Sequence, residues 1–167
     1  IDEVFMNKLM TLVIATGNSG KTAEIRDMLE GFPVNIKNLS DFGPIPPVEE
    51  DGETFDDNAY KKASSISKVL GLPALADDSG LVVEALGGAP GVYSARYAGE
   101  NATDRQRYTK LLNEMKGMTN RRAAFECVIS IAVPPGAALT YEARCEGIIA
   151  ETPAGEHGFG YDPVFYY

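Results

Sequence analysis

The stretch LVIATGNSGKTAEI, residues 12–25, constrains most strongly how this chain can fold. A β-rich apolar run from Leu9 to Thr16 leads into the polar loop TGNSGK, and Ile25, Met28 and Leu29 follow at helical spacing. We therefore expect a strand, a short loop and a helix in direct succession. The first N–H groups of a helix lack backbone partners and lie at the positive end of its dipole, so such a loop favours an anion.

The same stretch is close to a phosphate-binding P-loop but does not meet its pattern. Gly20, Lys21 and Thr22 fit the end of the motif, whereas Ala15 stands where the first glycine belongs. The segment PALADD, residues 73–78, is similar to a Walker B motif, in which an apolar strand ends in an acid. The P-loop kinase hypothesis predicts phosphoryl transfer to an acceptor, and the missing glycine and the lack of arginine-rich lid segments count against it. The hypothesis that this loop binds phosphate does not depend on the P-loop motif.

Length and composition indicate one ordinary globular domain over residues 1–167. A chain of 167 residues with 44% hydrophobic and 23% charged residues can bury a sizeable core without staples. No apolar run approaches the roughly 20 residues that cross a bilayer, and the N-terminal segment lacks the features of a signal peptide. We therefore expect a cytoplasmic protein without membrane contact. The residues before Met6, IDEVF, are left out of the fold argument.

Charge and rare residue types exclude several classes of function. The formal net charge of −9 argues against a nucleic-acid-binding protein, but a small anionic substrate is compatible with it when a divalent cation is present. Cys127 and Cys145 lack the spacing of a zinc site and are expected to be reduced thiols. His157 is the single histidine, so a His-rich metal site and a Ser-His-Asp triad lack parts.

The remaining pattern predicts a mixed α/β fold in the order β-α-β-α-β-β-α-β-β-β. Thr54 is expected to cap a helix over residues 55–70, and Thr103 a helix that runs to about Met115. The segment PALADDSGLVVEAL predicts two short strands around an Asp-Ser-Gly turn. The other expected elements are a strand over 33–39, an irregular Pro-rich acidic loop over 41–53, and a hairpin of strands 122–133 and 139–149. Helices are expected to pack over a sheet of mixed direction.

Three polar clusters are candidates for chemistry, and each has a purely structural alternative. The first is the TGNSGK loop, which is otherwise an ordinary capped turn. The second, Glu49 to Asp57, contains six acids and is otherwise a solvated loop with a negatively charged helix start, although carboxylates there can hold Mg²⁺. The third is Asp77-Asp78-Ser79-Gly80, otherwise a turn. The apolar run before it favours function, since carboxylates in clefts are common general bases and metal ligands.

Four blocks in this order resemble the inosine triphosphate pyrophosphatase family, which hydrolyses non-canonical purine nucleoside triphosphates. The blocks are TGNSGK (16–21), EEDGETFDDNAYKKA (49–63), ADDSGLVVEALGGAPGVYSARYAG (76–99) and GFGYDPVF (158–165). The resemblance implies an α/β fold with an elongated mixed sheet flanked by helices, two lobes, and an active-site cleft between them. It also implies a homodimer.

The resemblance further implies roles for individual residues. Asp78 would be the catalytic carboxylate and a Mg²⁺ ligand, with Asp77 beside it. Glu50 would be the other ligand, with Glu49 as the alternative. The substrate-binding set would be Thr16, Gly17, Asn18, Ser19, Gly20 and Lys21 at the triphosphate, Lys62 at a phosphate, Ser79 beside Asp78, and Phe159, Gly160, Tyr161 and Asp162 at the base.

The implied reaction is attack of water on the α-phosphorus of ITP, dITP or XTP, which gives the monophosphate and pyrophosphate. Two other interpretations remain. One is a pyrimidine or modified-nucleotide pyrophosphatase of the septum-formation inhibitor type, although that family opens with a loop that differs from TGNSGK. The other is a non-catalytic nucleotide-binding regulator. Family members usually continue beyond GFGYDPVF through a Ser-His-Arg segment that is expected to contact the base. The sequence is therefore expected to be incomplete there, which leaves base preference open.

Overall fold

The structure is a computed structural model that describes residues 9–135 and 137–167. The segment IDEVF and Gly136 of the expected Pro-Pro-Gly turn lie outside these ranges. The chain divides into two compact units. The N-terminal unit comprises residues 1–52, 56–77 and 129–140, and the C-terminal unit comprises residues 53–55, 78–128 and 141–167.

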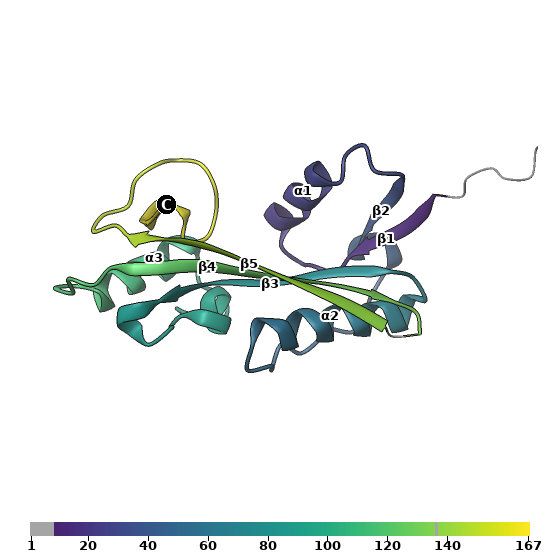
Figure 1. The fold of residues 1–167 in the computed structure, drawn as a ribbon, viewed down its shortest axis with the longest axis horizontal. Coiled ribbons are helices and arrows are strands. Elements are labelled where there is room, and N and C mark those ends of the chain that lie inside the picture. The colour runs from purple at the N-terminus through teal and green to yellow at the C-terminus, as the bar shows by residue number, and fades with distance from the viewer. Residues whose placement is uncertain (1–8, 136) are drawn as a thin grey trace, which may run out of the picture. The chain divides into compact units, whose positions relative to one another are not determined.

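The described residues form a six-stranded mixed sheet with helices, which confirms the mixed α/β class (Figure 1). The elements are β1 Met10–Ile14, α1 Ser19–Met28, β2 Val34–Asn38, α2 Phe55–Leu70, β3 Ala74–Val83, α3 Asp104–Glu114, β4 Arg122–Val133, β5 Ala137–Ile149 and β6 Phe165–Tyr166, with short 3-10 helices at Leu39–Phe42, Glu84–Leu86, Gly91–Arg96 and Asp162–Val164. The strand order is β2-β1-β3-β4-β5-β6. β1 runs parallel to β2 and β3, and β5 runs antiparallel to β6. No helix in the described ranges has the length and apolar character of a membrane span.

The N-terminal unit is held by α2 packed on strands of the sheet. Ala63 and Ile66 of α2 share a buried cluster with Val13, Ala74 and Ala132. The helix has the bounds predicted from its apolar spacing. In contrast, α1 buries no residue, and Met28 is 73% exposed. Of the three apolar residues expected at helical spacing, Ile25 and Leu29 are only half-buried and Met28 is exposed, so α1 contributes little to the core.

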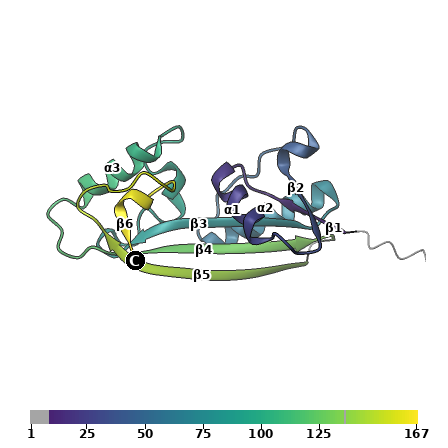
Figure 2. The same ribbon diagram turned by 90° about the horizontal axis from the view of Figure 1, so that it is seen from above.

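The C-terminal unit has its own core, which joins α3 to β3 and to the end of the chain. Leu111 of α3 and Met115, which caps the end of this helix, are buried with Leu81, Ile149 and Val164. Figure 2 shows the yellow C-terminal segment beside α3, and a hydrogen bond from Gly160 N to Asp104 Oδ2 joins them. Thr103 caps α3 as expected: its Oγ1 accepts from Gln106 N at 3.1 Å.

One expected feature is wrong: β3 is a single ten-residue strand, without an Asp-Ser-Gly turn. Asp77, Asp78 and Ser79 lie within it. Gly80 explains why a turn-like sequence stays extended. A Cβ there would lie 2.5 Å from the Gly91 carbonyl oxygen and 2.6 Å from Ser94 Oγ, so the glycine permits close backbone packing, as glycines within strands often do.

Candidate functional site

The TGNSGK loop is organised by its own side chains. Asn18 Oδ1 accepts hydrogen bonds from Gly20 N at 2.9 Å and Lys21 N at 3.1 Å, so Asn18 caps α1. Thr16 Oγ1 accepts from Asn18 N at 3.2 Å. The backbone amides of Asn18, Gly20 and Lys21, which were expected to face phosphate, thus make capping bonds within the loop. This geometry fixes the start of α1 and the base of the Lys21 side chain.

Lys21 contacts a buried carboxylate of β3. Its Nζ lies 2.5 Å from Asp77 Oδ2, and the side chains are 24% and 5% exposed. Residues 56 positions apart in the sequence therefore bring an ammonium group from the first turn of α1 to the middle of β3. A partly exposed cation held by a buried acid is suited to receive an anion from solvent.

The second lysine–carboxylate pair joins α2 to the acidic loop. Lys62 Nζ lies 3.2 Å from Glu50 Oε1, and the Lys62 side chain is 13% exposed. Glu50 is half-buried while Glu49 is exposed, so the structure places Glu50 beside the lysine. The neighbouring pair Lys61–Asp51, at 2.5 Å, is far more exposed.

Asn58 fixes the acidic loop to α2, a role that the sequence did not reveal. Its side chain is buried, and its Oδ1 accepts from Gly52 N at 2.8 Å. A Cβ on Gly52 would lie 2.7 Å from that oxygen, so the glycine is required for the contact. The available signal was a polar residue on the apolar face of the predicted helix, one turn before Lys62.

Asp77 and Asp78 are consecutive, buried residues of β3, 4% and 7% exposed. Successive side chains of a strand point to opposite faces. Asp77 belongs to the N-terminal unit, where it contacts Lys21, and Asp78 belongs to the C-terminal unit together with half-buried Ser79. The two neighbouring acids therefore have different surroundings.

The segment Phe159–Asp162 is closed by three hydrogen bonds within the C-terminal unit. Phe159 N donates to Asp162 Oδ2 at 2.9 Å, Gly160 N donates to Asp104 Oδ2 at 2.8 Å, and the Tyr161 hydroxyl donates to the Ser94 carbonyl oxygen at 2.7 Å. Tyr161 is 4% exposed, and burial raises the pKa of its hydroxyl above the ordinary value. The structure thus places Tyr161 in the core, as a support of the segment, while Phe159 is half-buried.

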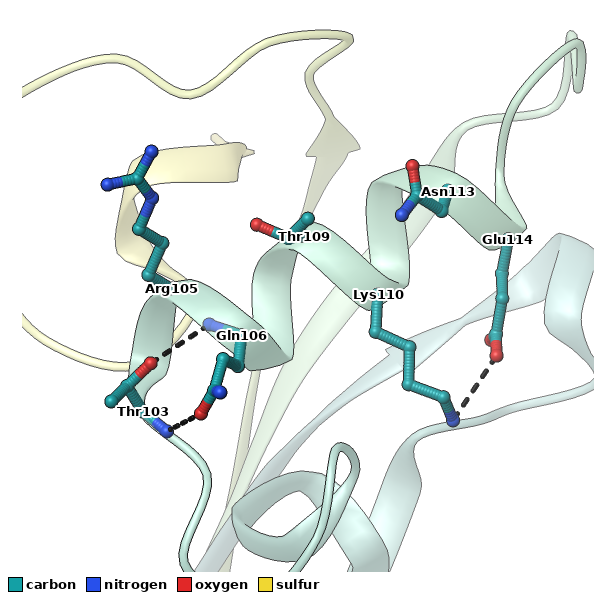
Figure 3. A pocket seen from close by; sticks show the side chains of 7 residues that line it. All are labelled: Thr103, Arg105, Gln106, Thr109, Lys110, Asn113 and Glu114. Carbon is teal, nitrogen blue, oxygen red and sulfur yellow. Dashed lines mark hydrogen bonds and ion pairs between the residues drawn. The ribbon is translucent and has the colours of Figure 1, made fainter.

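A hollow on the outer side of α3 contains none of the predicted site residues (Figure 3). It is lined by Thr103, Arg105, Gln106, Thr109, Lys110, Asn113 and Glu114. Its hydrogen bonds and ion pairs, those between Thr103 and Gln106 and between Lys110 and Glu114, are ordinary contacts of a solvent-facing helix. The hollow is the surface relief of long polar side chains, and the candidate site does not include it.

The donor chemistry of the candidate residues fits Mg²⁺. Glu50 and Asp78 offer carboxylate oxygens, the ligands that this ion prefers. Within the described ranges, no group of three or more His, Cys, Asp and Glu residues is placed to hold a metal ion. Mg²⁺ commonly uses one or two carboxylates and completes its shell with water and substrate phosphates. A carboxylate pair that shares the ion with a polyphosphate therefore fits these residues.

Comparisons with known proteins place the chain in a family. Residues 12–167 match the model of the Ham1 family, so the chain belongs to this family. Two relatives are named dITP/XTP pyrophosphatase. The protein of Syntrophobacter fumaroxidans is 62% identical over 93% of this chain and 67% of the relative, and that of Desulfotalea psychrophila is 57% identical over 93% and 70%. These matches confirm the recognition made from the four sequence blocks.

Solved structures of similar proteins agree with this family assignment. A HAM1 protein from Coxiella burnetii has a TM-score of 0.87 at 44% identity, over 95% of this chain and 82% of that one. A nucleoside-triphosphatase, dITP/XTP pyrophosphatase, from Mycobacterium abscessus has a TM-score of 0.81 at 40% identity, over 93% and 83%. The fold described above is therefore the fold of this family.

Proposed function

We propose that this protein hydrolyses non-canonical purine nucleoside triphosphates, namely dITP, ITP and XTP, to the monophosphate and pyrophosphate with the help of Mg²⁺. The observation that carries the proposal is the lysine–carboxylate set of the N-terminal unit, Lys21–Asp77 and Lys62–Glu50. Two ammonium groups and adjacent carboxylates match a substrate that arrives as a polyphosphate with a divalent cation. Relatives named dITP/XTP pyrophosphatase supply the substrate class.

The N-terminal unit is proposed to bind the phosphates. Lys21 and Lys62 exchange their carboxylate partners for phosphate oxygens and offset the charge that develops on the leaving pyrophosphate. Asn18 keeps α1 capped, so the helix start and Lys21 stay in place during this exchange. Thr16, Gly17, Ser19 and Gly20 complete the loop around the phosphates.

Asp78 is proposed to orient the attacking water and accept its proton, while water adds to the α-phosphorus and the bond to the bridging oxygen of pyrophosphate breaks. Before phosphate binds, Asp77 holds Lys21 from the neighbouring position of β3. Glu50 and Asp78 would hold the Mg²⁺, which, when bound, supplies Lewis-acid neutralisation of phosphate charge. Ser79 follows Asp78 in β3 and is proposed to bind the substrate beside it.

Selection of the base is proposed for the segment Phe159–Asp162. Phe159 offers an aromatic face for stacking, and Gly160 and Asp162 offer backbone and carboxylate groups to the base edge. A 6-keto purine presents an acceptor at O6 and a donor at N1, the reverse of adenine, so a matched dry pocket leaves buried polar groups unpaired with adenine.

We further propose that residues 1–167 belong to one pyrophosphatase domain, with the two-lobed architecture and cleft that the resemblance implies, and that the protein is a cytoplasmic homodimer. The continuity of β3 supports one domain, since Asp77 and Asp78 are consecutive and belong to different units.

A substrate panel tests the proposed function. The enzyme is assayed with dITP, ITP, XTP, GTP, ATP and dTTP, with Mg²⁺ and with EDTA. We expect Mg²⁺-dependent release of pyrophosphate from dITP, ITP and XTP, in preference to the other three. A preference for dTTP would favour the septum-formation inhibitor type, binding without turnover would favour a regulator, and full activity in EDTA would contradict the metal role.

A further inference from the structure

The carboxylate of Asp104, at the first position of α3, makes two contacts at once. Its Oδ2 accepts from Gly160 N at 2.8 Å, and its Oδ1 accepts from Arg107 Nη1 at 2.6 Å. Arg107 lies one turn further along the same helix, and its side chain is 19% exposed. The arginine therefore fixes the rotation of the carboxylate, so that one oxygen faces the amide of Gly160.

Gly160 lies in a turn whose backbone conformation favours glycine. Its φ is +63°, in the left-handed region that favours glycine, and Gly158 has a φ of +89°. The same segment is tied at the next residue, where the Tyr161 hydroxyl donates to the Ser94 carbonyl oxygen. Phe159 and Asp162 lie on either side of these two ties.

The Ser94 tie leads on to β3. Ser94 Oγ accepts from Leu81 N at 2.9 Å and donates to the Gly91 carbonyl oxygen at 2.6 Å. Leu81 is three residues beyond Asp78 in the same strand. Tyr161 is thus tied to the strand of the catalytic carboxylate through a buried serine, and Gly160 is tied to α3 through Asp104. The contact between Gly160 and Asp104 is partly exposed to solvent, since the Asp104 side chain is 45% exposed.

We propose that Asp104 is a positioning residue for base recognition: by holding Gly160 it sets the place of Phe159 and Asp162, and thereby the discrimination between purine bases. This inference rests on the proposed function, which assigns the base to the segment Phe159–Asp162. Asp104 itself touches neither the phosphates nor the reacting water in this account. Its loss should therefore act on the base and leave phosphate binding unchanged.

The test compares Asp104→Ala and Asp104→Asn with the matched control Glu114→Gln. Glu114 is a carboxylate at the other end of α3, where it pairs with Lys110 at 3.2 Å and accepts from the Tyr97 hydroxyl. Three readouts are taken from each enzyme: the ratio of kcat/KM for dITP to that for dATP, binding of dIMP and of pyrophosphate by calorimetry, and hydrogen exchange at the Gly160 amide.

We expect Asp104→Ala to lower the dITP-to-dATP ratio about tenfold, chiefly through KM, to weaken dIMP binding by a similar factor, and to speed exchange at Gly160. Pyrophosphate binding should stay at the wild-type value. Asp104→Asn keeps one acceptor oxygen and should recover part of the loss, and it provides the reading if the alanine variant does not fold. Glu114→Gln should match the wild type.

An unchanged dITP-to-dATP ratio in both Asp104 variants would overturn the inference, as would an equal loss of pyrophosphate binding or an equal effect of Glu114→Gln. The preference of the wild-type enzyme for dITP over dATP distinguishes a failure of this inference from a failure of the proposed function. If it does not prefer dITP to dATP, the proposed function fails; if it does and the Asp104 variants keep that preference, only the inference fails.

Discussion

Lys21 Nζ lies 2.5 Å from Asp77 Oδ2, and Asp77 directly precedes Asp78 in β3. A phosphate-binding candidate is therefore anchored one residue from the candidate catalytic carboxylate. Replacing Lys21 by Met removes the cation beside a carboxylate that is 5% exposed, and a hydrogen bond to a charged group contributes about 2 kcal/mol. We expect Lys21→Met to lower the free energy of unfolding by about that amount in urea titrations, and to reduce kcat/KM.

The double variant Lys21→Met/Asp77→Asn separates these effects. Without the carboxylate charge the stability should largely return, because a neutral amide is less costly to bury than an unpaired charge. Activity should remain low, since the phosphate-binding ammonium group is still missing. Recovery of both stability and kcat/KM would show that Lys21 has only a structural role.

Asp78→Asn should lower kcat by at least about a hundredfold, because the amide cannot accept the proton of the attacking water. The variant should keep the far-ultraviolet circular dichroism spectrum and the unfolding midpoint of the wild type to within a few degrees. Near-normal turnover in a folded variant would remove Asp78 from the proposed catalytic role.

Lys62 and its neighbour Lys61 form a matched pair for testing the phosphate contact. Both lie on α2 and pair with acids of the same loop, but Lys62 is 13% exposed and Lys61 is 44% exposed. We expect Lys62→Met to reduce kcat/KM for dITP at least about tenfold and Lys61→Met to leave it within about twofold. If both substitutions lower kcat/KM equally in steady-state assays, the general positive charge of α2 explains the loss, and a specific contact of Lys62 with phosphate does not.

The sequence predicted most of the elements because their signals are local. The apolar spacing of 55–70 and the Thr103 cap each lie within a few turns, and both helices have the expected bounds to within a residue. β3 was predicted wrongly because the reason for its continuity is distant: Gly80 admits the Gly91 carbonyl and Ser94 from another segment. The Asp104–Gly160 contact was missed for the same reason, since 56 positions separate the two residues.

The candidate site was predictable as residue types but not as contacts. The pairs Lys21–Asp77 and Lys62–Glu50 join separate blocks of the sequence, and no local pattern specifies such partners. Tyr161 was expected at the base because the resemblance to the family implies that Phe159–Asp162 bind there. Its burial in the core depends on packing against α3 and β3, which only the tertiary structure supplies.

Tyr161 predicts a change of stability at alkaline pH. Burial raises the pKa of its hydroxyl in the folded state above the ordinary value of 10.0, so the folded state retains the proton longer than the unfolded state. The resulting stabilisation is fully present below pH 10 and is lost as the pH rises through the folded-state pKa. Unfolding curves above pH 10 should therefore show a steeper loss of stability for the wild type than for Tyr161→Phe. Identical pH slopes would contradict this.

The most direct measurement of the central claim follows the oxygen of the attacking water. Hydrolysis of dITP in water enriched in the heavy oxygen isotope, with the products analysed by mass spectrometry, shows which phosphorus is attacked. Attack on the α-phosphorus, as proposed, places the label in dIMP and leaves pyrophosphate unlabelled. Label in pyrophosphate, or release of orthophosphate with the diphosphate, would contradict the account.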